Sequence, residues 1–212
     1  MRIALAALLL SGCAITNPVL SLSAPTTPAR PSDYVNQVKR WTRRGDTLFD
    51  FDAALIIDAT FHAPEFQAAF DAKYIDAYRV NENARAQVLA KLDAAADEGW
   101  VFHLESQSHT YELGNIKPPK TIWRTTLIDD KGREVSASAI SQDRTRPEVL
   151  IAFYPYIGIF SRAWRVVFPK TLPDGTPLVT PETKNLTLRI AGPPGIIELR
   201  WRFAEELPAA SK

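Results

Sequence analysis

The sequence is poor in cysteine and has no excess of charge of either sign, and both shortages narrow what the chain can be. Cys13 is the only cysteine among 212 residues, so no disulfide forms within the chain and its stability must come from a packed core. Lys and Arg number 25 against 24 Asp and Glu. Because such a balance is poor evidence for binding a polyanion, we expect no nucleic-acid partner.

Recognisable catalytic motifs are also missing from the sequence. It contains no G-x-S-x-G, no S-x-x-K and no H-E-x-x-H, which rules out the common signatures of serine hydrolases and zinc proteases. Nothing in the sequence singles out one serine, histidine and aspartate as a catalytic group. These absences favour a non-enzymatic role.

The first residues of the chain, MRIALAALLLSGC, have the layout of a secretory signal peptide. Arg2 supplies a positive start, the apolar run Ile3 to Leu10 follows, and Ser11 and Gly12 are small. An apolar run of this length is too short to span a bilayer, which takes about 20 residues. The pattern predicts export and removal of residues 1–12, which leaves 24 cationic and 24 acidic side chains.

Leu10-Ser11-Gly12-Cys13 resembles the lipobox of bacterial lipoproteins in order, spacing and position. The resemblance implies that the Cys13 thiol is diacylated, that cleavage occurs before it, and that the new amino terminus is acylated. This covalent lipid is the only bound group that we expect. Ala14 rather than Asp follows Cys13, which by the same resemblance implies sorting to the outer membrane, facing the periplasm. The mature domain loosely resembles Gram-negative envelope lipoproteins to which no activity is attached.

The remainder of the chain divides into a tether and one domain. Residues 13–32 carry four prolines among Ala, Ser and Thr, which predicts an extended tether that holds the domain clear of the bilayer. Residues 33–212 have the length of a single domain. Within it, the spacing predicts a helix from Asp33 to Arg44, ended by Gly45, with cationic residues near its end.

Alternation of apolar and polar residues predicts a strand over 47–61, followed by two helices over 65–78 and 82–98. Further strand patterns occur at 100–112, 121–129, 133–140, 149–157, 162–168, 185–191 and 196–203. Short strands joined by turn residues indicate an antiparallel arrangement. The predicted fold is mainly β: an antiparallel β-sandwich of about eight strands, with the helical insertion 65–98 between the first and second strands.

The segment HLESQSHTY, residues 103–111, is the best candidate for chemistry. On a strand, His103 and Glu105 share one face, and both are types of metal ligand. A metal site would also need His62 to fold back beside His103, because His109 lies about 20 Å further along the strand. The alternative interpretation is a polar, solvated strand face, which we favour.

The densest aromatic stretch is FYPYIGIFSRAWRVVF, residues 153–168. Tyr154, Tyr156 and Phe160 lie around a Pro and a Gly, which is typical of a loop that contacts a protein or a glycan. The leading hypothesis is a lipid-anchored, non-enzymatic binding or assembly module whose loop meets a protein or cell-wall partner. The alternative is a metal-binding protein or metal-dependent enzyme centred on His103 and Glu105.

Overall fold

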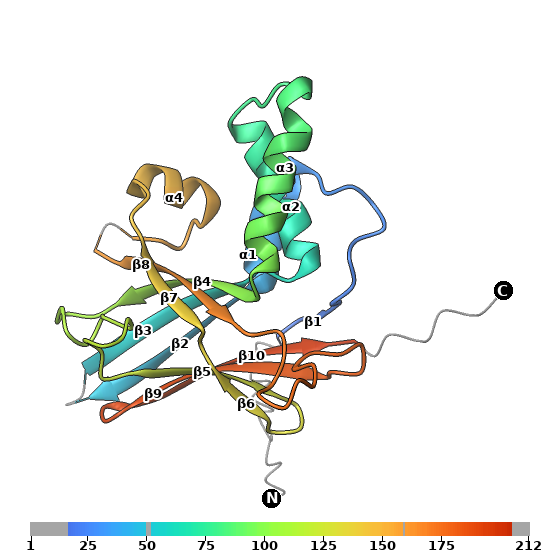
Figure 1. The fold of residues 1–212 in the computed structure, drawn as a ribbon. Helices are drawn as coiled ribbons and strands as arrows, with labels where there is room; N and C mark the ends of the chain where they lie inside the picture. Colours follow the sequence, from blue (N-terminus) through green and yellow to red (C-terminus); the bar gives the residue numbers. More distant parts are fainter. Residues whose placement is uncertain (1–16, 50–51, 159, 205–212) are drawn as a thin grey trace, which may run out of the picture.

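Two five-stranded sheets form the body of the molecule in the computed structural model, which describes residues 17–49, 52–158 and 160–204 (Figure 1). Sheet A contains, in order, β1 (Val19–Leu20), β10 (Gly195–Phe203), β9 (Asn185–Gly192), β5 (Arg124–Asp129) and β6 (Glu134–Ser136). Sheet B contains β2 (Thr42–Phe49), β3 (Asp52–Phe61), β4 (Trp100–Gln107), β8 (Arg162–Phe168) and β7 (Ala139–Asp143). All neighbouring strands run antiparallel except β1 and β10.

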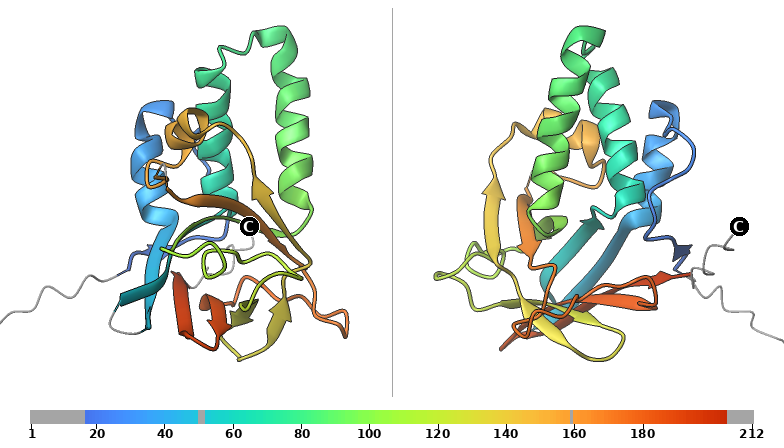
Figure 2. Two further views of the ribbon diagram at one scale, coloured as in Figure 1. Left: turned by 90° about the vertical axis from the view of Figure 1, so that its left-hand side faces the viewer. Right: turned by 45° about the vertical axis from the view of Figure 1, so that its right-hand side comes forward.

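The helices lie on the side of sheet B that faces away from sheet A (Figures 1 and 2). They are η1 (Pro31–Asp33), α1 (Tyr34–Trp41), α2 (Pro64–Ala77), α3 (Glu82–Asp97) and α4 (Pro147–Phe153). The pair α2 and α3 rises from the sheet as an antiparallel hairpin. No helix within the described ranges is both long and apolar enough to span a membrane.

Large apolar side chains fill the space between the two sheets. Phe61 of β3 stacks on Phe102 of β4 with 4.6 Å between ring centroids, and Trp201 of β10 packs edge-on against Phe102 at 5.3 Å. All three are fully buried. The indole Nε1 of Trp201 also donates to the carbonyl of Trp41 at 2.7 Å, which joins the end of α1 to sheet A. These residues belong to one continuous core of buried apolar side chains, and apolar area removed from water stabilises the fold by about 25 cal/mol per Å².

The predicted helices 65–78 and 82–98 are confirmed to within a residue or two as α2 and α3. Pro64 occupies the first turn of α2, where its missing N–H costs nothing. Asn81 caps α3 by accepting a hydrogen bond from the backbone N–H of Ala84 at 2.9 Å. The strands predicted at 162–168, 185–191 and 196–203 also match β8, β9 and β10.

The predicted helix from Asp33 to Arg44 is shorter in the structure and passes directly into a strand. It ends at Trp41, and Thr42 already begins β2. Gly45 therefore does not end a helix. It lies within β2, where a Cβ atom would stand 2.8 Å from Ile197 Cγ2 and 2.9 Å from Leu199 Cδ2 of β10. The glycine lets the two sheets approach each other closely at this point.

The predicted number of strands and helices is wrong in three places. The single strand expected over 47–61 is two strands, β2 and β3, which pair as a hairpin. The pattern at 133–140 is divided between β6 and β7, which belong to different sheets. The pattern at 149–157 is helical, since α4 covers Pro147–Phe153. The fold is thus mainly β with two five-stranded sheets and four α-helices, and the long helical pair lies between β3 and β4.

The predicted tether is wrong at residues 17–20, which join sheet A, whereas residues 21–30 form a mostly exposed segment without helix or strand. Val19–Leu20 pairs with β10 as strand β1, and Leu20 is only 1% exposed. Arg202 donates from Nη2 to the carbonyl of Asn17 at 2.8 Å, and the N–H of Ala204 donates to Leu20 at 2.8 Å. Residues 17–30 therefore run along the domain. The proline content correctly predicted an extended chain, but it could not predict that the Leu20 side chain is buried in the core.

A pair of adjacent substitutions tests whether this segment is docked. Leu20→Ala should lower the free energy of unfolding by about 2 kcal/mol, because it empties a buried site at the edge of the core. Val19→Ala is the matched control, since Val19 is 54% exposed, and it should change stability by less than about 0.5 kcal/mol. Equal unfolding curves for the two variants in chemical denaturation would show that the segment is free.

Candidate functional site

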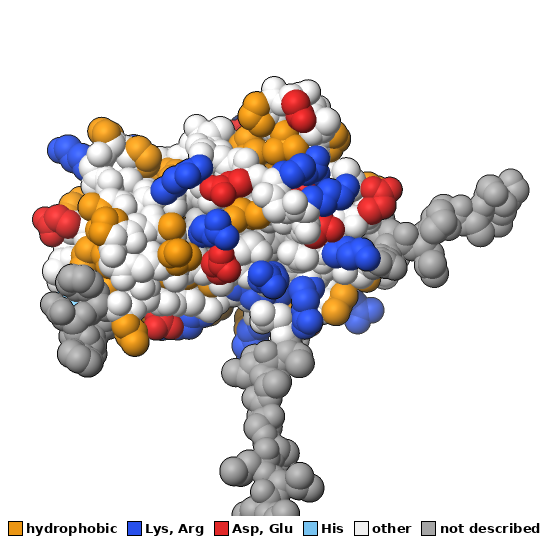
Figure 3. Space-filling view, turned by 90° about the horizontal axis from the view of Figure 1, so that it is seen from below, with side chains coloured by type: hydrophobic (Ala, Val, Ile, Leu, Met, Phe, Trp, Pro, Cys, Tyr) orange, Lys and Arg blue, Asp and Glu red, His pale blue; other side chains and the backbone are white. Residues whose placement is uncertain are grey.

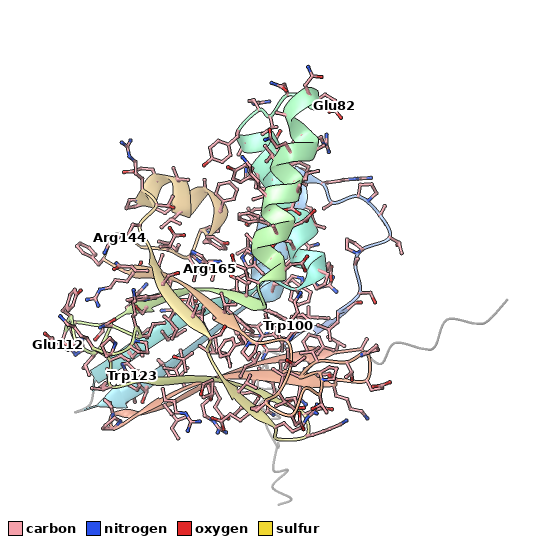
Figure 4. The ribbon with its side chains drawn as sticks, in the orientation of Figure 1. Glu82, Trp100, Glu112, Trp123, Arg144 and Arg165 are labelled. Atoms are coloured by element: carbon pink, nitrogen blue, oxygen red, sulfur yellow. The ribbon has the colours of Figure 1, made fainter. Side chains whose placement is uncertain are left out.

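One face of sheet B carries polar side chains and yet lies buried beneath the helices. In register across the sheet, Thr60 of β3 is opposite His103 of β4, and Asp58 is opposite Glu105. All four are at most 5% exposed. Thr42 and Arg44 of β2 and Arg165 of β8 extend the same face on either side. The helices α2 and α3 and the segment that links α4 to β8 cover it (Figure 4, where Arg165 is labelled).

The prediction of a solvated strand face around His103 is therefore wrong. The alternation was correct, because His103 and Glu105 do share one face of β4 while Phe102 and Leu104 face the other sheet. The polar side of the strand is covered by other parts of the chain. His109 belongs to an exposed loop, because β4 ends at Gln107.

Buried polar groups need partners, and most of this face has them. Arg44 Nη1 binds Asp58 Oδ2 at 2.6 Å. Burial raises the pKa of Asp58 to about 6, although Arg44 opposes the shift. Thr60 Oγ1 lies 2.7 Å from Thr42 Oγ1 and 2.8 Å from the hydroxyl of Tyr156. These contacts hold the β2 side of the face in one arrangement.

A directed chain of hydrogen bonds runs through His62, the residue that follows β3. Gln67 Nε2 donates to Asp71 Oδ1 at 2.8 Å, so Gln67 Oε1 is left to accept from His62 Nδ1 at 3.0 Å. The proton of a neutral His62 then lies on Nδ1, and Nε2 accepts from the hydroxyl of Tyr154 at 2.8 Å. Burial lowers the pKa of His62 to about 3. His62 is thus an uncharged link between α2 and Tyr154.

The ring nitrogens of His103 lack hydrogen-bond partners in the part of the chain that the structure describes, as does the buried Oε2 of Glu105 on the same face. Its ring stacks on that of Tyr154, with the two planes nearly parallel and 3.7 Å between centroids. The side chain is only 6% exposed, and within the described residues neither Nδ1 nor Nε2 makes a hydrogen bond. Nε2 lies 3.5 Å from Asp143 Oδ2, which is longer than a hydrogen bond of about 2.7–3.2 Å. Burial lowers the pKa of His103, although Asp143 opposes the shift, so the imidazole is neutral.

A cavity of about 230 Å³ opens beside His103. Its polar side is formed by His62, His103, Tyr154, Asp143 and Arg165. Its apolar side is formed by residues of α2, α3 and β4, namely Phe70, Leu92, Ala95, Ala96 and Val101. Arg165 is held in place by Glu98, 2.9 Å from its Nη1, and by the carbonyl of Ala95, 2.7 Å from its Nη2. The cavity therefore combines a largely apolar wall with a few fixed polar groups, which is typical of a small-molecule site.

The metal alternative joined three residues that the structure only partly brings together. His62 and His103 do line the same cavity. Glu105, however, turns its Oε1 toward the backbone N–H of Gly158 and the amide of Gln107, each 2.9 Å away. Within residues 17–49, 52–158 and 160–204, no three His, Cys, Asp or Glu side chains are placed to hold one ion.

The predicted aromatic contact loop is mostly internal. Tyr154 is 5% exposed and stacks on His103, and Tyr156 binds Thr60. Burial raises the pKa of both tyrosines well above the usual value, so both phenols stay protonated. Phe160 alone is open to solvent, with 91% of its surface exposed. The sequence could not separate packing from contact here, because alternation is lost where α4 ends in an irregular segment.

Gln67, Asp143 and Arg165 belong to the site but were not predicted from the sequence. Each lies on a different element, and no local spacing connects them. Comparisons with protein-family models, with curated proteins and with solved structures found no match. A function for this chain must therefore be inferred from the geometry of the cavity.

The buried, uncharged state of His62 predicts a particular dependence of stability on pH. Its pKa is about 3 when folded and about 6.5 when unfolded. Below pH 6.5 the unfolded chain takes up a proton that the folded chain refuses, so stability is lost as the pH falls. Between pH 7 and pH 5 the loss due to His62 should be about 2 kcal/mol. In the His62→Gln variant the amide oxygen can still accept a hydrogen bond from Tyr154, but the side chain does not titrate. Between pH 7 and pH 5 this variant should therefore lose about 2 kcal/mol less stability than the wild type.

Chemical denaturation of both proteins at pH 7 and pH 5 measures this difference directly. Comparison with the wild type is needed because other groups also titrate in this range. The pKa values of Asp58 and Asp71 are both raised to about 6 in the folded protein, so these two residues add stability as the pH falls, opposite to His62. His109→Gln, on the exposed loop, serves as the control and should behave as the wild type. A His62→Gln variant with the full wild-type loss would show that His62 is already charged in the folded protein.

Proposed function

We propose that this chain is a lipid-anchored envelope protein that binds a small, mainly apolar ligand in the cavity beside His103. The observation that supports the binding site most strongly is His103 itself. Leaving a buried polar group without a partner costs about 1–3 kcal/mol. Nδ1 of His103 has no partner among the described residues, and Nε2 has only the long 3.5 Å contact with Asp143 Oδ2. Both nitrogens are closed to water, so a ligand recovers that energy only by moving into the space that Tyr154 and the covering helices now close.

The shape and charge of the cavity narrow the class of ligand. A cavity of about 230 Å³ is somewhat larger than the engineered cavity of about 150 Å³ that holds benzene in another protein. Arg165 and Asp143 carry opposite charges, and His62 and His103 are neutral. The ligand that fits best is an uncharged molecule of one or two rings, or a branched aliphatic of that size, with a single hydrogen-bonding group for the His103 imidazole.

The location of the protein is proposed from its first residues, which lie outside the described ranges. Leu10-Ser11-Gly12-Cys13 supports lipidation of Cys13, and Ala14 supports retention at the outer membrane, facing the periplasm. Acylation of both the thiol and the amino terminus gives more than one chain, which is what stable anchoring needs. A binding role on the membrane also agrees with the absence of a catalytic motif in the sequence.

A pair of probe molecules tests the cavity. p-Cresol and toluene have the same ring and methyl group, and only p-cresol carries a hydroxyl. We expect p-cresol to bind with Kd on the order of 1 mM and toluene to bind about tenfold more weakly, since toluene leaves His103 without a partner. Ligand-observed NMR titration of the mature chain measures both affinities.

The matched variant for this test is His103→Phe, which preserves a ring to stack on Tyr154. In this variant the preference for p-cresol over toluene should disappear while toluene still binds. His109→Phe should keep the preference, because His109 lies outside the cavity. Absence of saturable binding to the wild type, or a preference that survives in His103→Phe, would contradict the proposed site.

Lipidation is tested separately. Cells expressing the full chain with a labelled fatty acid should give labelled protein in the membrane fraction, and Cys13→Ser should give none, because Cys13 is the only thiol. Label that persists in Cys13→Ser would show that the cysteine is not the acylated residue.

A further inference from the structure

The outer face of sheet A is the part of the domain nearest to the proposed lipid anchor. Asn17 is held at the β1 edge of this sheet by its hydrogen bond from Arg202. Only three residues separate Cys13 from Asn17, so their Cα atoms are at most about 14 Å apart. The domain therefore cannot stand far from a bilayer that holds Cys13. Docking of residues 17–30 removes the long spacer that the composition predicted.

Arginine side chains dominate this outer face. In register across the sheet, Arg189 of β9 is opposite Glu198 of β10, and Thr187 is opposite Arg200. Exposed and buried residues alternate along β10, and the register places Arg189 of β9 and Arg124 of β5 on the same surface as the outward side chains of β10. Figure 3 looks at this face from below and shows Lys and Arg side chains across its centre and right, with Asp and Glu side chains among them.

The charges on the face do not cancel. The outward arginines of the three strands are Arg124, Arg189, Arg200 and Arg202, and the outward carboxylates of β6 and β10 are Glu134 and Glu198. Both carboxylates are already engaged, since Arg124 lies 3.1 Å from Glu134 and Arg189 lies 2.7 Å from Glu198. Among the described residues, Arg200 and Arg202 have no carboxylate partner; they bond to the Thr187 hydroxyl and the Asn17 carbonyl.

We infer that the outer face of sheet A lies against the surface of a membrane that contains anionic phospholipids. The inference rests on the proposed anchoring at Cys13, which brings this face close to the headgroups, and on the surplus of arginine, which matches their charge. A basic residue near an anionic surface is worth about 1 kcal/mol. Sheet A spans about 19 Å across its five strands, so the whole face lies near the anchored edge.

This orientation places the cavity on the aqueous side. Sheet B and the helices lie beyond sheet A (Figures 1 and 2), and α2 and α3 point away from it. A ligand would then enter from the aqueous compartment, while the opposite face of the protein remains on the lipid.

Vesicle binding of an unlipidated protein tests the face without help from acyl chains. The mature chain, residues 13–212, carrying Cys13→Ser is mixed with vesicles that contain about one third phosphatidylglycerol in phosphatidylcholine, and bound protein is measured by sedimentation. We expect binding that weakens as salt increases and that is lost on pure phosphatidylcholine. Arg124→Gln with Arg200→Gln should weaken it about 25-fold, about fivefold for each arginine. Arg202 is left unchanged because it holds Asn17.

The control variant is Arg85→Gln with Lys91→Gln on α3, which removes the same charge from an exposed helix beyond sheet B. It should bind as the parent protein does. Equal losses in the two double variants, or equal binding to pure phosphatidylcholine, would overturn the inference, as would the absence of binding to the anionic vesicles at low salt. Because this test uses neither the acyl chains nor the cavity, its failure is distinct from failure of lipidation or of ligand binding.

Discussion

Burial of a polar sheet face is the constraint on which this structure depends. Sheet B is apolar toward sheet A, as in any pair of packed sheets, but its other face carries Asp58, Thr60, His103 and Glu105 beneath helices. Each polar group removed from water must find a partner or cost stability. The Arg44–Asp58 ion pair and the chain from Asp71 to Tyr154 meet this demand with side chains from β2, α2 and the segment after α4. The helices are therefore tied to the sheet by polar as well as apolar contacts.

Within the described ranges, His103 is one of two residues on this face with buried polar atoms that lack hydrogen-bond partners, Glu105 Oε2 being the other, and His103 is the one that lines the cavity. Its neighbours are fixed: Tyr154 is held by His62, and Arg165 is held by Glu98 and Ala95. Tyr154 and Arg165 are therefore held in position, while a hydrogen bond to the buried His103 nitrogens requires some of the side chains that cover them to move. The same burial that leaves His103 unpartnered also lowers its pKa and that of His62, so the cavity offers neutral imidazoles. The proposed preference for an uncharged ligand results from this neutrality.

The sequence predicted elements with strong local signals and missed features that depend on distant contacts. The helices α2 and α3 follow from periodicity and capping, and the hairpin of β9 and β10 from alternation about Gly192-Pro193-Pro194-Gly195. The hairpin of β2 and β3 was predicted as one strand because apolar and polar residues alternate from 47 to 61 without an obvious break. For the site, alternation correctly placed His103 and Glu105 on one face. Burial of that face could not be predicted, because it depends on helices and tyrosines from other parts of the chain.

Nitrogen NMR of the protein labelled with ¹⁵N-histidine tests most directly whether this polar face is buried as described. The two imidazole nitrogens report the tautomer and the charge of His62 and His103 individually. From pH 7.5 down to pH 5 the His62 ring should remain neutral and carry its proton on Nδ1, as its bond to Gln67 requires, and the pKa of His103 should lie below its usual value. The exposed His109 provides the internal comparison. If His62 became doubly protonated above pH 6, the face would be open to water, and the ligand site built on it would be wrong.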